Sequence, residues 1–180
     1  MRKLVLAGLV VVAAGLTIVA AGAFAGGGGH SRGAVLNGYN EVVGPGSIST
    51  TGHGSLRLRI EDDGIHYRLR YSAMEGAVSA AHIHFAQRHV GGGIIADLCN
   101  GNELPCTSPN GDISGVITPA EIKGPAGQGI PPGATGYPEA VRAVRAGATY
   151  ANVHSTPNFG GGEIRGQIER GHKGRGGGDR

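Results

Sequence analysis

The chain contains no tryptophan, three phenylalanines and five tyrosines, so aromatic residues make up only 4% of it. A platform of exposed aromatic rings, on which bases or sugars stack, is therefore not expected. Charged residues are also scarce, at 16%, and the formal net charge is only +3. Part of that charge lies in the glycine-rich tail at residues 170–180. We therefore expect no nucleic-acid partner.

Familiar catalytic motifs are missing as well. The chain has no phosphate-binding GxxxxGK[ST] loop and no dinucleotide-binding glycine pattern followed by its acidic residue. Ser79 and Ser155 lie near histidines in the sequence, but nothing places an acidic residue behind them. Glu41 and Glu163 are isolated carboxylates, which more often serve as ion-pair partners or caps. We name no catalytic residue and expect a binding or structural protein rather than an enzyme.

One long apolar run opens the chain. Arg2 and Lys3 precede a stretch that is apolar or small from residue 4 to 22, and Ala23-Phe24-Ala25 fits the small-x-small cleavage pattern. This predicts a secretory signal peptide over residues 1–25. The alternative is an uncleaved anchor helix, because the run is close to the roughly 20 residues that span a bilayer. Export would place the protein outside the cell or in the cell envelope, with membrane contact only if the segment stays uncleaved.

The remainder divides into three parts. Residues 26–32 are predicted to form a glycine-rich linker, residues 33–169 one domain, and residues 170–180 a disordered basic tail. Cys99 and Cys106 are the two cysteines of the chain. In an oxidising compartment they are expected to form a disulfide. The alternative is a pair of thiolate metal ligands.

Strand patterns dominate the domain. Ser55–Ile60 and Ile65–Tyr71 alternate strictly, and Asp63-Gly64 between them is typical of a hairpin turn. The apolar members should face the core. Four arginines and a histidine should share the opposite, solvated face, where they could receive an acidic partner. The residues on this solvated face are Arg57, Arg59, His66, Arg68 and Arg70.

Further strands are expected over residues 34–37, 78–85, 94–98, 112–117, 149–154 and 163–168. Short helices are expected at residues 118–121, which form a capping box, and at residues 137–147, which begin with proline and end at glycine. In the second helix Val141 and Val144 should face the core. The pattern predicts an all-β fold, an antiparallel β-sandwich of about eight strands with one or two short helices.

Three histidines are the strongest candidates for a binding site. His82 and His84 are two apart in a strand, so they project to one side, while Ile83 projects to the core. Asn152 and His154 alternate in the same way in a later strand. If the two strands are neighbours, the three histidines can meet and hold a copper or zinc ion. A fourth ligand is left open among His53, His66, His89 and Asp97. The alternative is a set of histidines without metal, each solvent-exposed or bonded to a carbonyl.

Two segments carry a resemblance to a known family. "AHIHFAQRHVGGGIIADL" and "VRAGATYANVHSTPNFGGGEIRGQI" resemble the CHRD domain, first named for chordin. "AVLNGYNEVVG" and "TGHGSLRLRI" are similar to the family's opening strands, with Val43 where proline is usual. The resemblance covers residues 34–168 and implies an extracellular β-sandwich module with no assigned activity.

The resemblance also implies a polar site. It comprises His82, His84, His154, Glu163, Arg165 and Gln167. Glu163 and Arg165 share one side of a strand, where they would pair with each other or orient the histidines, or else form only a surface ion pair. Our main hypothesis is a secreted or cell-surface, non-catalytic binding module. Its partner would be an extracellular protein or a cell-envelope polymer.

A more distant likeness is to the copper/zinc superoxide dismutases. These carry an H-x-H strand in a β-sandwich, with an arginine near the copper, and His82, His84, His154 and Arg165 echo that arrangement. The chain has no loop dense in histidine and aspartate, and both cysteines lie in one loop. The likeness gives the alternative hypothesis: a copper- or zinc-binding protein with dismutase-like activity.

Overall fold

The computed structural model describes residues 31–42, 44, 46–101 and 104–170. The predicted signal segment, residues 26–30 of the linker and residues 171–180 of the tail lie outside them. Ser31 and Arg32, assigned to the linker by the sequence, begin the first strand, and Arg170 ends the last. Among the described residues, no helix is long and apolar enough to cross a membrane.

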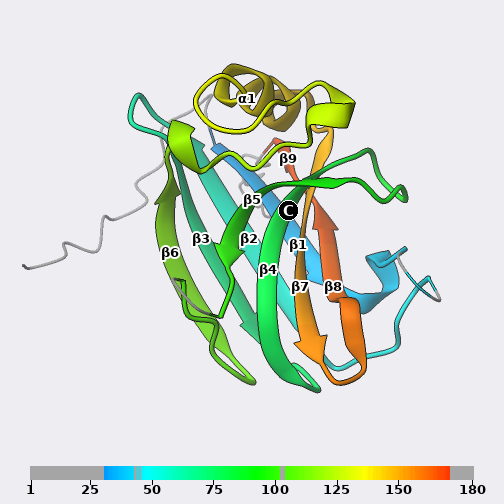
Figure 1. Ribbon diagram of the computed structural model, residues 1–180. Coiled ribbons are helices and arrows are strands. Elements are labelled where there is room, and N and C mark those ends of the chain that lie inside the picture. Colours follow the sequence, from blue (N-terminus) through cyan, green and yellow to red (C-terminus); the bar gives the residue numbers. More distant parts are fainter. Residues whose placement is uncertain (1–30, 43, 45, 102–103, 171–180) are drawn as a thin grey trace, which may run out of the picture.

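The described residues form nine strands, one α-helix and three short 3-10 helices (Figure 1). The strands are β1 (Ser31–Asn37), β2 (His53–Ile60), β3 (Ile65–Ser72), β4 (Ala77–Phe85), β5 (Gly93–Cys99), β6 (Gly111–Ile117), β7 (Thr149–Thr156), β8 (Phe159–Gln167) and β9 (Glu169–Arg170). The helices are η1 (Gly38–Asn40), η2 (Pro119–Glu121), η3 (Ala126–Gln128) and α1 (Tyr137–Ala146).

All strand pairs are antiparallel, in the order β5-β4-β7-β8-β1-β2-β3-β6, with β9 added beside β1. The sheet curls so that its end strands, β5 and β6, come into contact (Figure 1). Inside the curl, the Tyr67 hydroxyl on β3 donates to the carbonyl of Leu98 on β5 at 2.9 Å. The predicted all-β antiparallel fold is confirmed. Its two layers are the two halves of one continuous sheet.

The β2–β3 hairpin forms as its alternation predicts. Leu58 pairs with Tyr67, and Ile60 with Ile65, directly before and after the turn. Gly64 adopts φ +158°, and a Cβ there would lie 2.6 Å from the carbonyl oxygen of Ile117, so this turn requires glycine. The predicted core residues of the hairpin are all buried: Leu56, Leu58, Ile60, Ile65, Tyr67, Leu69 and Tyr71.

The α1 helix covers one end of the curled sheet (Figure 1). Pro138 lies in its first turn, and Gly147 ends it in the left-handed conformation with φ 74°. Val141 and Val144 are buried as predicted, together with Ala140 and Ala143. The predicted capping box at Thr118 is present, but it begins only the single 3-10 turn η2.

The predicted disulfide is confirmed, since Cys99 and Cys106 are bonded to each other. Both sulfurs are consumed by this bond, so the alternative role as thiolate metal ligands is wrong. The bridge anchors the end of β5, two residues beyond Asp97, to the loop that leads to β6. It therefore holds the strand that lies next to the first two histidines.

Candidate metal centre

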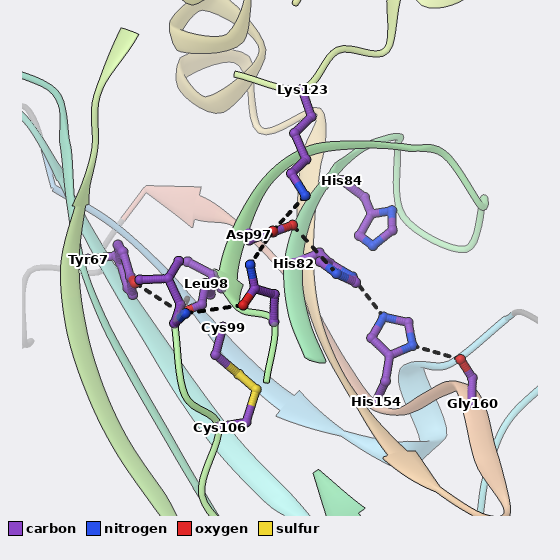
Figure 2. A network of polar contacts seen from close by, with 12 residues as sticks. Tyr67, His82, His84, Asp97, Leu98, Cys99, Cys106, Lys123, His154 and Gly160 are labelled. Atoms are coloured by element: carbon purple, nitrogen blue, oxygen red, sulfur yellow. Dashed lines mark hydrogen bonds and ion pairs between the residues drawn. A yellow bond between two sulfur atoms is a disulfide. The ribbon is translucent and has the colours of Figure 1, made fainter. Parts of the chain in front are cut away.

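β4 and β7 are hydrogen-bonded neighbours, and they bring the three histidines together. In their register His82 lies opposite Asn152, and His84 lies opposite Tyr150. β4 also has register shifts against β5 on either side of the His82-Ile83 pair, and such bulges re-aim side chains. One ring nitrogen from each of His82, His84 and His154 lies within 4.8 Å of the other two. We call these three residues the histidine centre (Figure 2).

Backbone carbonyls fix two of these rings. Nδ1 of His84 lies 2.9 Å from the carbonyl oxygen of Gly92, and Nδ1 of His154 lies 3.0 Å from that of Gly160. A carbonyl only accepts hydrogen bonds, so each Nδ1 carries the proton. The neutral rings then present an unprotonated Nε2. That of His84 is buried and has no hydrogen-bond partner.

His82 connects the centre to a carboxylate. Its Nδ1 lies 3.0 Å from Nε2 of His154, and its Nε2 lies 3.7 Å from Oδ1 of Asp97 (Figure 2). Without an ion, the proton on Nδ1 of His82 is donated to His154. If that proton moves to Nε2, facing Asp97, Nδ1 becomes free to bind a metal. Asp97 thus lies behind His82 rather than among the ligands.

Asp97 is itself held in place. Its Oδ2 accepts from Nζ of Lys123 at 2.6 Å and from Nδ2 of Asn100 at 3.2 Å. Its Oδ1 is buried, faces His82 and has no hydrogen-bond partner. The carboxylate is therefore oriented with one free acceptor toward the imidazole. Carboxylates in this position behind a histidine ligand fix its tautomer and raise its basicity.

Tyr150 gives the His84 ring a second support, and the sequence analysis does not identify it. Its ring stacks on His84, with centroids 4.7 Å apart and planes 5° from parallel. The guanidinium carbon of Arg165 lies 3.4 Å from the centroid of the Tyr150 ring. Period-two alternation does place Tyr150 on the side of Asn152 and His154. Its contact with His84 depends on the β4–β7 register.

If the histidine centre binds a metal, Tyr150→Leu should weaken that binding about tenfold, because His84 loses the ring that packs against it. Tyr150→Phe keeps the stack and should change the affinity less than about threefold. Competition with a chelating dye would measure both, on protein shown by circular dichroism to be folded. Wild-type affinity in the leucine variant would contradict the positioning role.

The connection between β4 and β5, residues 86–92, covers this face of the sheet. Arg165 donates to the carbonyl of Val90 at 2.7 Å. Gln167 donates to the carbonyl of Ala86 at 3.1 Å and to that of Gly147 at 2.8 Å. These contacts hold the connection against β7 and β8, and His84 is consequently only 8% exposed. His84 is therefore buried rather than solvated, and its bond to the Gly92 carbonyl is also what the metal-free alternative predicts.

The family can be assigned once this geometry is known. The family model of the CHRD domain matches residues 32–168. The chain belongs to the CHRD family. The match includes all three histidines and every strand from β2 to β8, so the predicted resemblance is confirmed. Searches of curated proteins and of solved structures returned no match.

Within this CHRD domain, burial holds the three imidazoles of the histidine centre neutral. Burial, followed by the nearby His154 and His84, lowers the pKa of His82 to about 4. Burial also lowers the pKa of His84 and that of His154, against the opposing effect of the Gly92 and Gly160 carbonyls. A metal binds the neutral imidazole. At neutral pH the centre therefore has its ligands in the form that a metal requires.

Glu163 has a different role in the CHRD domain from the one predicted. Its carboxylate accepts from Oγ1 of Thr50 at 2.6 Å, from the backbone N–H of Glu75 at 2.9 Å and from the hydroxyl of Ser155. It is fully buried, and among the described residues it forms no ion pair with Arg165. Both the predicted pairing and the surface ion pair are therefore wrong. Glu163 ties β8 to β7 and to the segments flanking β2 and β3.

The other predicted ligands lie elsewhere. His66 bonds to Asp63 at 2.8 Å beside the β2–β3 turn, and His53 bonds to Ser72 at 3.0 Å. His89 is exposed in the β4–β5 connection, where its φ is 63°. Within the described part of the chain, none of these imidazoles belongs to the histidine centre. The fourth position of a metal would need a ligand from outside this set.

Glu41 is a buried group that the sequence analysis treats as an isolated carboxylate. It is 2% exposed, and neither of its carboxylate oxygens has a hydrogen-bond partner. Burial raises its pKa to about 7, against the opposing charge of Arg165. Gly162 makes room for it, because a Cβ there would lie 2.5 Å from Oε1 of Glu41. Nothing in the local sequence distinguishes this glutamate from an exposed one.

Proposed function

We propose that this CHRD protein is exported and that its histidine centre binds one copper or zinc ion without catalysing a reaction. One observation carries the proposal. Each of the three imidazoles has one nitrogen directed at an oxygen of Gly92, Gly160 or Asp97 and the other directed at the shared centre. Such outer oxygens are the usual partners of metal-binding histidines.

The spacing of the nitrogens supports an ion of this size. Zinc–nitrogen bonds are about 2.0–2.1 Å, so two nitrogens on one ion lie at most about 4 Å apart. The separations here reach from 3.0 Å to at most 4.8 Å, so small ring rotations suffice. Imidazoles suit both zinc and copper, and affinity for a given site normally favours copper. Three ligands leave one position for water or a partner's side chain.

Two features support export. The predicted signal peptide over residues 1–25 would direct secretion. The Cys99–Cys106 disulfide suits an oxidising compartment, where such bonds persist. The protein would then meet its metal and its partners outside the cytosol.

Arg165 favours binding over catalysis. In the likeness to the dismutases this arginine would stand near the metal. Here its guanidinium packs on the Tyr150 ring and donates to the carbonyl of Val90. It is 2% exposed and supports the covering connection. This position suits a structural support for the centre better than a group that attracts a substrate anion.

Metal analysis tests the proposal. The protein, purified without an affinity tag, is loaded with Cu²⁺ or Zn²⁺, dialysed and analysed by mass spectrometry for bound metal. We expect one ion per chain, and an affinity at least about 100-fold lower in the His82→Ala/His84→Ala variant. His53→Ala/His66→Ala removes the same number of imidazoles outside the centre and is the matched control. Near-zero metal in the wild type, or an equal loss in the control, would refute the site.

A superoxide assay on the copper-loaded protein tests the absence of catalysis. We expect no faster dismutation than with the His82→Ala/His84→Ala variant at equal total copper. A dismutation rate that falls in the His82→Ala/His84→Ala variant would show that the protein has dismutase-like activity, against the proposed non-catalytic role.

A further inference from the structure

A second polar site lies on the outer face of β2 and β3, in the half of the sheet that does not carry the histidines. A hollow of about 220 Å³ is lined by Ser55, Arg57, Arg68 and Arg70. We call it the arginine hollow. All four side chains project from the face opposite the core, as the alternation of the hairpin requires. Arg57 and Arg70 are exposed, and Arg68 is half-buried.

The register places like charges side by side. Arg57 lies directly opposite Arg68, and Ser55 lies directly opposite Arg70. Like charges facing each other across a strand pair are destabilising. On the far side of Arg57 the neighbour is Gly33, which has no side chain to offer a counter-charge. The hairpin therefore concentrates positive charge at a cost to its own stability.

One carboxylate pairs with two of these three guanidinium groups. Asp112 accepts from Nε and a terminal nitrogen of Arg68, both at 2.7 Å, and from Nε of Arg70 at 3.2 Å. These hydrogen bonds, that of Arg68 first, lower the pKa of Asp112 to about 2. In the part of the chain that the structure describes, Arg57 forms no ion pair. The hollow keeps an excess of positive charge.

We propose that the arginine hollow binds an acidic polysaccharide through the sulfate or carboxylate groups of that polymer. A guanidinium binds such an oxyanion in a fork, with two hydrogen bonds. The fork of Arg68 already holds Asp112, whereas that of Arg57 forms no ion pair with any described residue. The Cα atoms of Arg68 and Arg70 are about 7 Å apart along the strand, and that of Arg57 is about 5 Å across from that of Arg68. Arg57 and the Arg68–Arg70 pair therefore offer two neighbouring positive positions to successive anions on a chain. No aromatic ring lines the hollow, so the bases of a nucleic acid would lack a stacking partner. The proposal rests on the exported location given above but not on the metal.

The test uses the full chain with EDTA present and measures binding to dextran sulfate, with neutral dextran as the polymer control. We expect binding to dextran sulfate alone, weakening as salt rises because counterions compete. Arg57→Gln should weaken it about fivefold or more, and Arg142→Gln less than about twofold, although both remove one charge. Arg142 is the matched control because it is exposed on α1 and paired with Glu139. Asp112→Asn should strengthen binding, because it removes the negative charge that pairs with Arg68 and Arg70. A misfolded variant would instead bind more weakly.

Four results would overturn the proposal. Equal weakening by Arg57→Gln and Arg142→Gln would mean that only net charge matters. If single-stranded DNA binds more tightly than dextran sulfate, and this binding depends on Arg57, the ligand of the hollow is a nucleic acid rather than a polysaccharide. If inorganic sulfate, at a concentration equal to that of the polymer's sulfate groups, displaces dextran sulfate, the hollow binds single anions rather than a polymer. Loss of binding in a chain that ends at Arg170 would move the site to the tail. Metal binding of Arg57→Gln, measured separately, should equal that of the wild type, so the two proposals fail independently.

Discussion

Replacing Glu163 by alanine is expected to lower the free energy of unfolding by about 3–5 kcal/mol. The carboxylate is fully buried and accepts hydrogen bonds from Thr50, Glu75 and Ser155. Removing it leaves these donors without a partner, at about 1–3 kcal/mol for each buried group. Denaturant unfolding of the metal-free protein measures the change.

Two further variants sharpen this result. Glu163→Gln keeps one acceptor oxygen and should lose less stability than Glu163→Ala. Glu169→Ala removes an exposed carboxylate from β9, the next strand in the sequence, and should change stability by less than about 1 kcal/mol. A loss of under 1 kcal/mol in Glu163→Ala would show that its three contacts are unimportant.

Metal affinity separates the structural role of Glu163 from the predicted role in orienting the histidines. Under conditions where Glu163→Ala is folded, we expect its copper affinity to stay within about threefold of the wild type, because its hydrogen bonds do not reach the histidine centre. A fall of about tenfold or more in the folded variant would restore the orienting role.

Replacing Glu41 by glutamine is expected to change how stability depends on pH. Burial raises the pKa of Glu41 from its ordinary 4.5 to about 7. Between these values the folded protein keeps the proton that the unfolded chain has released. This stabilisation is complete below pH 4.5 and is lost as the pH rises through 7. At about 1.4 kcal/mol per unit, the loss amounts to about 3 kcal/mol.

The lowered pKa of His82 changes the pH dependence of stability in the opposite direction. Burial lowers the pKa of His82 from 6.5 to about 4, so its contribution is present above pH 6.5 and is lost as the pH falls through 4. A single stability curve therefore mixes the two effects. The difference between Glu41→Gln and the wild type isolates the glutamate.

Denaturant unfolding of metal-free protein at a series of pH values checks this prediction. Relative to the wild type, Glu41→Gln should gain about 3 kcal/mol between pH 4.5 and pH 8. Glu169→Gln, which changes an exposed carboxylate, should follow the wild-type curve throughout. Parallel curves for Glu41→Gln and the wild type would show that folding does not raise the pKa of Glu41.

Local patterns were enough to predict much of the fold. The β2–β3 hairpin, the buried face of α1 and the disulfide each depend on residues close together in the chain. Alternation also showed that His82 and His84 share a side of their strand, because side-chain direction in a strand repeats every two residues. Alternation in residues 150–154 also supplied the third candidate, His154, and the resemblance to the CHRD family agreed with it.

The sequence by itself determined which side of each strand is polar and which residue types a metal could use. Only the tertiary structure decided that β4 pairs with β7, in a register that places His84 on Tyr150 and His82 within reach of His154. It also decided that Glu163 serves the fold and that Glu41 is buried. The reason is that alternation fixes the direction of a side chain but not its neighbouring strand. Strand order is set by the packing of the whole core.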